Sequence, residues 1–130
     1  MTEPDSPFDR PSDALPTTDD AALERLKRFG GGKLLGEMIS LFISAAPVRI
    51  GAARAGVDAR DATAAEMALH SLKSSSAQLG ALRMQRLSEQ GEAIARKGDL
   101  ERVDHVVREL EAEFPHVLRW LERARIRENA

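Results

Sequence analysis

The sequence predicts an all-α protein, an antiparallel four-helix bundle with an additional short helix at its N-terminus. Apolar residues recur at steps of three and four in five separate segments, as on one face of an α-helix. No segment alternates between apolar and polar residues with a period of two, so no strand is expected. The connections between the segments are short, which favours antiparallel neighbours. The 130 residues fit a single domain.

The first 18 residues differ in composition from the rest of the chain and are expected to form a flexible tail. Residues 1–18 contain four of the six prolines, and their acidic residues outnumber the single basic residue, Arg10. Such a segment offers little apolar surface for burial. The folded domain is therefore predicted over residues 19–127.

The first predicted helix is short. Thr18, Asp19 or Asp20 can cap its N-terminus, because each side chain can accept a hydrogen bond from a free backbone N–H. Its apolar positions follow at three-residue spacing: Leu23, Leu26 and Phe29. The glycines at 30–32 end this helix after about ten residues, and it is expected to cover the bundle as a lid.

The second predicted helix runs from Lys33 to about Ala55 and carries a wide apolar stripe. The stripe comprises Leu35, Met38, Ile39, Phe42, Ile43, Ala46 and Ile50. Its width suffices for contact with two neighbouring helices. Pro47 lies inside the segment and cannot donate a backbone hydrogen bond, so a kink or a break is expected there.

Three further helices complete the predicted bundle. Residues 61–79 form a helix with a narrow apolar seam, and this helix ends at Gly80. Residues 83–97 form the next helix, and the last begins at Leu100 and continues over three heptads of apolar spacing. Pro115 lies inside this last helix, where we expect a bend.

The composition excludes several classes of function. The chain has no cysteine, which removes thiolate metal sites, disulfides and cysteine nucleophiles. Its formal net charge of −2 gives no indication of nucleic-acid binding. The N-terminus lacks the pattern of a secretory signal, and the apolar stretch from Met38 to Val48 is too short and interrupted to span a bilayer. A soluble, cytoplasmic protein without membrane attachment is expected.

The segment most informative about function surrounds His70. The helical step places four side chains on one stripe, about a hundred degrees round from the leucine seam: Glu66, His70, Lys73 and Ala77. The imidazole is therefore expected to point into solvent. Small side chains beside it, Ser71 and Ser74, leave room for another protein to approach the ring.

An exposed imidazole is suited to phosphoryl transfer. Its neutral form is abundant near pH 7, because the reference pKa of histidine is about 6.5. Attack on an aspartyl phosphate gives a phosphoramidate of high transfer potential, so transfer can run in both directions. The transition state spreads negative charge over the phosphoryl oxygens, which calls for positioning and a nearby cation. Lys73, one turn from His70, can supply that cation.

The run from His70 to Ala81 resembles the signature of the histidine-containing phosphotransfer (HPt) domain, His-x-Leu-Lys-[Gly/Ser]-x-[Ser/Ala]-x-x-Leu-Gly-Ala. The similarity covers roughly residues 20–121. Its other matching positions are Leu41-Phe42, Ala46-Pro47, Leu87, Glu92, Ala95-Arg96 and Gly98-Asp99-Leu100.

The resemblance implies a helical bundle that carries a phosphoryl group on His70, through Nε2, with Lys73 assisting. The implied partners are receiver domains of response regulators and hybrid histidine kinases, whose aspartates exchange the phosphoryl group with the histidine. The chain would have no kinase activity, metal or cofactor of its own, and Mg²⁺ would come from the partner. The partner is expected to dock around His70, on Glu66, Ser71, Ser74, Ala77 and Gln78.

Two positions depart from the family pattern. Ser74 stands where many relatives have glycine, and a serine is small enough to leave transfer possible while narrowing the choice of partner. Gly91 occupies a seam position where the family often has leucine. We expect Gly91 to cost local stability, through low helix propensity and lost burial.

Other classes of function remain open. The bundle could bind a receiver domain or a kinase without receiving phosphate, as an inhibitor or scaffold. A metal or ligand carrier would need inward acids and histidines, whereas the seams are apolar, which ranks it last.

His105 and His116 would lie about 16 Å apart on a continuous helix, too far to share a metal ion, and are assigned surface roles. The glycines at 30–32 lack the spacing of a nucleotide-binding loop. The apolar positions can be satisfied within one chain, which favours a monomer.

Overall fold

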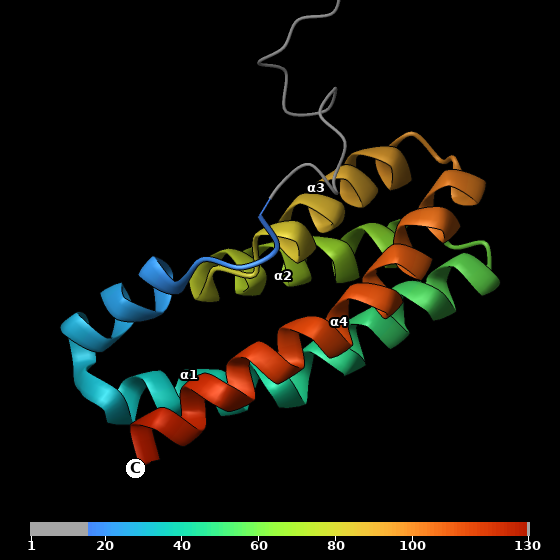
Figure 1. Ribbon diagram of the computed structural model, residues 1–130. Helices are drawn as coiled ribbons and strands as arrows, with labels where there is room; N and C mark the ends of the chain where they lie inside the picture. Colours follow the sequence, from blue (N-terminus) through green and yellow to red (C-terminus); the bar gives the residue numbers. More distant parts are fainter. Residues whose placement is uncertain (1–15, 130) are drawn as a thin grey trace, which may run out of the picture.

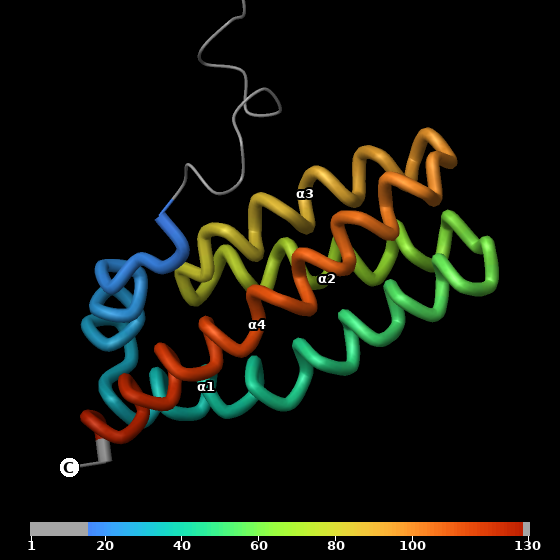
Figure 2. Tube along the Cα trace, turned by 45° about the vertical axis from the view of Figure 1, so that its right-hand side comes forward, coloured from blue at the N-terminus to red at the C-terminus, as the bar shows by residue number. Residues whose placement is uncertain are grey.

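The computed structural model describes residues 16–129, and this part of the chain forms four α-helices and no strand. The helices are α1 (Asp20–Asp58), α2 (Ala62–Leu79), α3 (Leu82–Arg96) and α4 (Leu100–Asn129). Each helix packs mainly against two neighbours, in the order α1, α2, α3, α4 and back to α1. The predicted all-α bundle is confirmed (Figures 1 and 2). Most of the predicted flexible tail, residues 1–15, lies outside the described residues.

The first helix combines the two predicted N-terminal helices. Asp19 caps it, because its side chain accepts a hydrogen bond from the N–H of Ala21 at 3.0 Å. At Gly31 the backbone adopts a left-handed φ of 79°, which kinks the helix. We call residues 20–30 the N-terminal arm. The glycine triplet separates this arm from the rest of α1, as predicted, although the helical backbone resumes directly after the kink (Figure 1).

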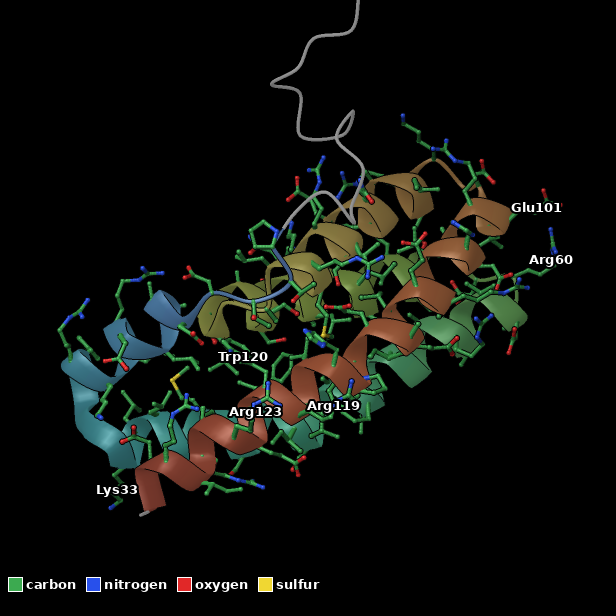
Figure 3. The ribbon with its side chains drawn as sticks, viewed as in Figure 1. Lys33, Arg60, Glu101, Arg119, Trp120 and Arg123 are labelled. Carbon is green, nitrogen blue, oxygen red and sulfur yellow. The ribbon has the colours of Figure 1, made fainter. Side chains whose placement is uncertain are left out.

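The N-terminal arm covers one end of the bundle. Leu23 is buried, and the Asp20 carboxylate accepts a hydrogen bond from Trp120 Nε1 on α4 at 2.7 Å. Figure 3 shows Trp120 on the side of α4 that faces the arm. Phe29 follows Leu23 and Leu26 at the predicted three-residue spacing, but it is 88% exposed, so it does not share their contact with the bundle. The arm also contacts the bundle further along, where Leu26 packs against the core and Lys27 Nζ lies 3.1 Å from Glu128 Oε2 of α4, whereas Phe29 faces solvent.

The two prolines inside helices do not interrupt them. In α1 only Gly31 departs from helical φ and ψ, so the break considered for Pro47 does not occur. α4 likewise continues through Pro115. Both prolines are exposed, so the carbonyl oxygen that each leaves without a backbone partner lies on the solvent side of its helix.

The core is aliphatic, as the composition requires. All four helices contribute fully buried side chains, among them Ile39, Leu69, Leu87 and Leu110. An aromatic pair, Phe42 of α1 and Phe114 of α4, crosses the bundle with 6.5 Å between ring centroids. The predicted seams therefore face one another in a single core.

Two glycines set how closely the helices approach. A Cβ atom at Gly91 of α3 would lie 2.9 Å from Leu69 Cδ1 and 3.0 Å from Val106 Cγ1. The expected loss of burial at Gly91 is therefore wrong, because side chains of the neighbouring helices fill the space. A Cβ atom at Gly56 of α1 would lie 2.8 Å from the backbone nitrogen of Ala65 in α2. Both glycines allow close contact between helices.

By length and composition alone, α1 is apolar enough to cross a membrane, with a mean hydropathy of 1.4 over its most apolar window. The apolar segment is thus longer than the stretch from Met38 to Val48 identified in the sequence. The core helix of a bundle passes the same test, and α1 places Leu35, Ile39 and Phe42 in the core. The length and composition of α1 are therefore weak evidence for a membrane span.

We predict that Gly56→Ala lowers the free energy of unfolding by roughly 1–3 kcal/mol, because the added methyl group meets backbone atoms of α2. Gly51 gives the matched control, since it lies in the same helix, is exposed, and has no atom within 4 Å of an added Cβ. Gly51→Ala should raise the free energy of unfolding by up to about 1 kcal/mol through helix propensity. Urea unfolding followed by circular dichroism measures both changes. Equal shifts in the two variants would contradict a tight contact at Gly56.

Candidate functional site

His70 lies on the outer face of α2, as predicted. Leu69 and Leu72 are fully buried, whereas the His70 side chain is 61% exposed. Asp61, the first residue of the predicted helical segment, caps α2, because its carboxylate accepts a backbone hydrogen bond from the first turn at 3.0 Å. It ends where Gly80 adopts a left-handed φ of 82°. These two ends and the buried leucines fix the rotation of α2, so the imidazole faces solvent.

A buried carboxylate from α3 holds two side chains of α2. Glu92 Oε2 lies 2.6 Å from His70 Nδ1, and Glu92 Oε1 accepts a hydrogen bond from Lys73 Nζ at 2.7 Å. The Glu92 side chain is only 7% exposed. The two predicted site residues, His70 and Lys73, therefore both contact the same third residue, Glu92. We call these three residues the His70 cluster.

The carboxyl group of Glu92 is held in its ionised form. Burial by itself raises the pKa of Glu92, but the hydrogen bonds from Lys73 and His70 outweigh burial and lower this pKa below its ordinary value. An ionised carboxylate can only accept hydrogen bonds, so the proton in this contact belongs to His70 Nδ1. In the neutral ring, Nε2 then carries the free lone pair. Glu92 thus selects the tautomer in which the lone pair lies on Nε2.

Arg96 of α3 extends the His70 cluster toward the start of α2. Arg96 Nε donates a hydrogen bond to Glu66 Oε2 at 3.0 Å, and Arg96 Nη2 lies 3.5 Å from Glu92 Oε2. Glu66, predicted as a docking residue, therefore forms an ion pair across the α2–α3 contact. A cleft beside the imidazole is lined by Glu66, Met67, His70, Ser71, Glu92 and Arg96.

The other predicted docking residues surround His70 without forming one pocket. Ser71 lines the cleft beside the ring, and the exposed Ser74 donates a hydrogen bond from Oγ to the His70 carbonyl oxygen at 3.4 Å. Ala77 is exposed, and Gln78 lines a separate groove between α1 and α2. These positions lie on open surface, and their contact with a partner stays a prediction.

The two other histidines lie on α4. His105 Nε2 is 2.8 Å from Glu109 Oε1, and His116 Nε2 is 3.0 Å from Thr17 Oγ1. Both histidines are exposed. Within residues 16–129, no group of three or more His, Cys, Asp or Glu side chains is arranged to hold a metal ion. Neither of these histidines contacts a buried carboxylate, in contrast to His70.

Glu92 is a site residue that the sequence interpretation did not assign to the site. Its position carries a signal, because it follows Gly91 on the buried face of α3, where a carboxylate requires partners. Arg96 follows Glu92 by four residues, a spacing at which two oppositely charged side chains of a helix can pair. The sequence does not indicate which residues of α2 complete the cluster, because that depends on the rotation of α3 against α2.

A helical bundle that presents one exposed histidine, held by a buried carboxylate, is the arrangement expected of a phosphoryl-carrier protein. The sequence model of the Hpt domain matches residues 37–120. The structure is similar to the crystal structure of histidine-containing phosphotransfer protein B from Pseudomonas aeruginosa PAO1, with a TM-score of 0.82 and 26% identity, over 87% of this chain and 97% of that chain. No curated protein matches the sequence. The chain belongs to the Hpt domain family, and it is a carrier in phosphorelay signalling.

The lowered pKa of Glu92 gives the stability of the fold a pH dependence. A carboxyl group whose pKa is lower in the folded state stabilises the fold above its unfolded pKa, and this contribution is lost as the pH falls through the folded pKa. The ordinary pKa of this group is 4.5. The stabilising contribution of Glu92 is therefore present above pH 4.5 and decreases below it.

We predict that Glu92→Gln lowers the free energy of unfolding by about 1–3 kcal/mol at pH 7, because two charge-assisted hydrogen bonds are weakened. The difference from the wild type should shrink as the pH falls below about 4.5. Urea unfolding at several pH values measures this difference. Glu37→Gln is the control, since it makes the same carboxyl-to-amide change at an exposed position. A difference that grows toward low pH would contradict an ionised, hydrogen-bonded Glu92.

Proposed function

We propose that His70 carries the phosphoryl group of the relay, through Nε2. The observation that carries this proposal is the hydrogen bond between His70 Nδ1 and the ionised Glu92, which leaves the Nε2 lone pair free on an exposed ring. A carrier needs a nucleophile that is both accessible and held in one orientation. His70 meets both requirements.

Transfer from a receiver domain is a displacement at phosphorus. His70 Nε2 attacks the phosphorus of an aspartyl phosphate, so an N–P bond forms while the P–O bond to the aspartate breaks. The aspartate carboxylate leaves with the electron pair of that bond. The imidazole keeps its Nδ1 proton and becomes positively charged, and Glu92 stabilises this charge through its hydrogen bond. Donation to another receiver reverses the same step.

Lys73 and the partner supply the remaining charges. The Lys73 side chain is 30% exposed, and Glu92 holds its ammonium group one turn from His70, within reach of the phosphoryl oxygens. The receiver domain supplies the aspartate and Mg²⁺. The glycines at 30–32 belong to the kink of α1, which gives no support to a phosphate-binding loop there. We therefore infer a carrier without kinase activity of its own.

The docking surface for the receiver lies on α1 and α2 beside His70. Leu41 and Val48 of α1 and Met67 of α2 are each about 70% exposed, so both helices present large apolar side chains to solvent. The groove between the two helices is lined by Met38, Leu41, Phe42, Ala45, Arg49, Ser75, Gln78 and Leu79. Apolar side chains gathered near a reactive group are typical of a protein interface. The polar part of this surface comprises Glu66, Ser71 and Ser74, and the small side chain of Ala77 lies exposed on the same helix.

The carrier acts as a cytoplasmic monomer in this proposal. The seams of all four helices are buried within one chain, so the fold requires no second copy for its core. The exposed apolar side chains of α1 and α2 are then available to successive receiver domains.

Phosphotransfer to variants distinguishes the carrier from a non-phosphorylated interaction module. We predict that the wild type takes up label from a phosphorylated receiver domain in the presence of Mg²⁺, whereas His70→Gln takes up none and keeps its circular dichroism spectrum. His105→Gln is the matched control, because His105 is also exposed, and it should be labelled at the wild-type rate. Label on His70→Gln at the wild-type level would disprove the site. A wild type that binds the receiver but never takes up label would favour the interaction module.

We predict that Val48→Asp weakens binding to the receiver domain by about tenfold or more, because a charge replaces an apolar contact at the interface. Ile126→Asp gives the matched control, since Ile126 is 67% exposed and lies near the end of α4. Surface plasmon resonance with the immobilised receiver compares the two dissociation constants. Equal constants for the two variants would place the docking surface elsewhere.

A further inference from the structure

A second groove lies between α3 and α4. It is lined by Gln90, Ala93, Ile94, Lys97, Arg102, His105, Val106 and Glu109. Its volume is about 370 Å³, within the usual range of about 300–1,000 Å³ for ligand-binding pockets. The residues that α3 contributes to the His70 cluster point toward α2, so the body of α3 separates this groove from His70. We call it the α3–α4 groove.

The α3–α4 groove combines an apolar floor with positive charge. Ile94 and Val106 supply apolar surface, and His105 is paired with Glu109 at 2.8 Å. Among residues 16–129, neither Lys97 nor Arg102 has an ion-pair partner for its side chain. The groove therefore presents two cations that have no ion-pair partner in the described part of the chain, together with the Glu109 carboxylate, beside apolar surface. An anionic segment with an apolar side chain complements it.

The chain itself contains a segment of this character. Residues 1–15 carry four acidic side chains, Glu3, Asp5, Asp9 and Asp13. They carry one basic side chain, Arg10, and one aromatic side chain, Phe8. The segment is thus anionic overall and has an aromatic residue near its centre.

The start of the described chain places this segment beside the groove. Pro16 lies against α3, in a hollow lined by Leu82, Gln85, Arg86 and Glu89. Thr17 bridges α3 and α4, because its carbonyl oxygen accepts a hydrogen bond from the Arg83 N–H at 3.4 Å and its hydroxyl lies 3.0 Å from His116 Nε2. Figure 1 shows this first described stretch passing over the beginning of α3.

The distance along the groove is within reach of residues 1–15. From Gln85 to Lys97, the axis of α3 advances about 18 Å. Six extended residues span about 20 Å, so residues 10–15 cover that distance. The residues before them, which include Phe8 and Asp9, can then lie beside Lys97.

We propose that the acidic N-terminal segment, residues 1–15, binds in the α3–α4 groove of its own chain. Its carboxylates pair with Lys97 and Arg102, and Phe8 covers the apolar floor. Attachment at Pro16 gives the segment an effective concentration in the millimolar range, so contacts too weak for a separate peptide suffice. The proposal is independent of phosphotransfer, because the groove and His70 lie on different sides of α3.

A spin label on the segment tests this binding in the full chain. The protein has no cysteine, so Ser6→Cys provides a single attachment site. Paramagnetic broadening of amide NMR signals then reports which surface the segment visits. We expect strong broadening at Ile94, Lys97 and Val106 and little on α1. The broadening should be lost in about 1 M salt, where the Debye length is about 3 Å.

Charge variants identify the groups responsible. Lys97→Glu combined with Arg102→Glu should abolish the broadening of the groove. Arg28→Glu combined with Lys33→Glu makes the same change in net charge at exposed positions near the kink of α1, and it should leave the broadening intact (Figure 3 labels Lys33). Broadening that persists in the groove double variant, or that is equal over α1 and the groove, overturns the proposal.

Two further measurements separate the remaining outcomes. Broadening that appears only when spin-labelled chains are mixed with isotope-labelled chains shows binding between copies, which overturns binding within one chain. Phosphotransfer to the Lys97→Glu/Arg102→Glu variant should proceed at the wild-type rate. A loss of transfer in that folded variant would show that the groove takes part in receiver docking and would overturn the proposed independence of the two sites.

Discussion

The orientation of the exposed His70 ring depends on one buried carboxylate, and the position of that carboxylate depends on the close approach of α3 to α2. Gly91 and Glu92 are consecutive in α3, and they face Leu69 and His70, which are consecutive in α2. At Gly91 the absence of a side chain lets Leu69 pack directly over the helix backbone. The next residue then lies close enough for its carboxylate to hold the imidazole at 2.6 Å. The packing contact and the functional contact are therefore parts of the same interface.

The His70 cluster is not the arrangement that stability alone would favour. Burial of the Glu92 carboxylate is unfavourable, and it is tolerated because Lys73 and His70 donate to both of its oxygens. An apolar residue in the same place would stabilise the bundle at least as well, since buried ion pairs rarely exceed the stability of hydrophobic packing. The carboxylate orients the ring and selects its tautomer. In the proposed function it also compensates the charge that the ring would acquire when Nε2 forms a bond.

Periodicity predicted α2 well because the relevant information is local. The cap at Asp61, the glycine at 80 and the leucine seam all lie within one short segment of the sequence. Together they determine that His70 is exposed. The Glu92 contact could not be derived in this way, since it depends on how two helices are rotated against each other.

The incorrect predictions have the same origin in tertiary structure. Phe29 follows the apolar spacing of its helix, yet the kink at Gly31 and the path of the N-terminal arm decide that it lies outside the core. The break considered at Pro47 does not occur, and Pro47 lies on an exposed face of α1. The burial around Gly91 depends on the neighbours that fill its space.

α1 has large apolar residues both on the face that packs in the core and on the face exposed to solvent. A helix in a soluble bundle usually has one apolar face and one polar face, whereas a helix that is apolar on all sides is typical of a protein interior or a membrane. In α1 the inner face carries Ile39 and Phe42, and the outer face also carries large apolar residues, Leu41 and Val48. The proposed receiver-docking surface accounts for the outer set, because a partner that arrives transiently requires apolar side chains that remain exposed between encounters. On this proposal α1 carries an apolar core face and an apolar docking face. The two faces together give the helix a mean hydropathy as high as that of a membrane span.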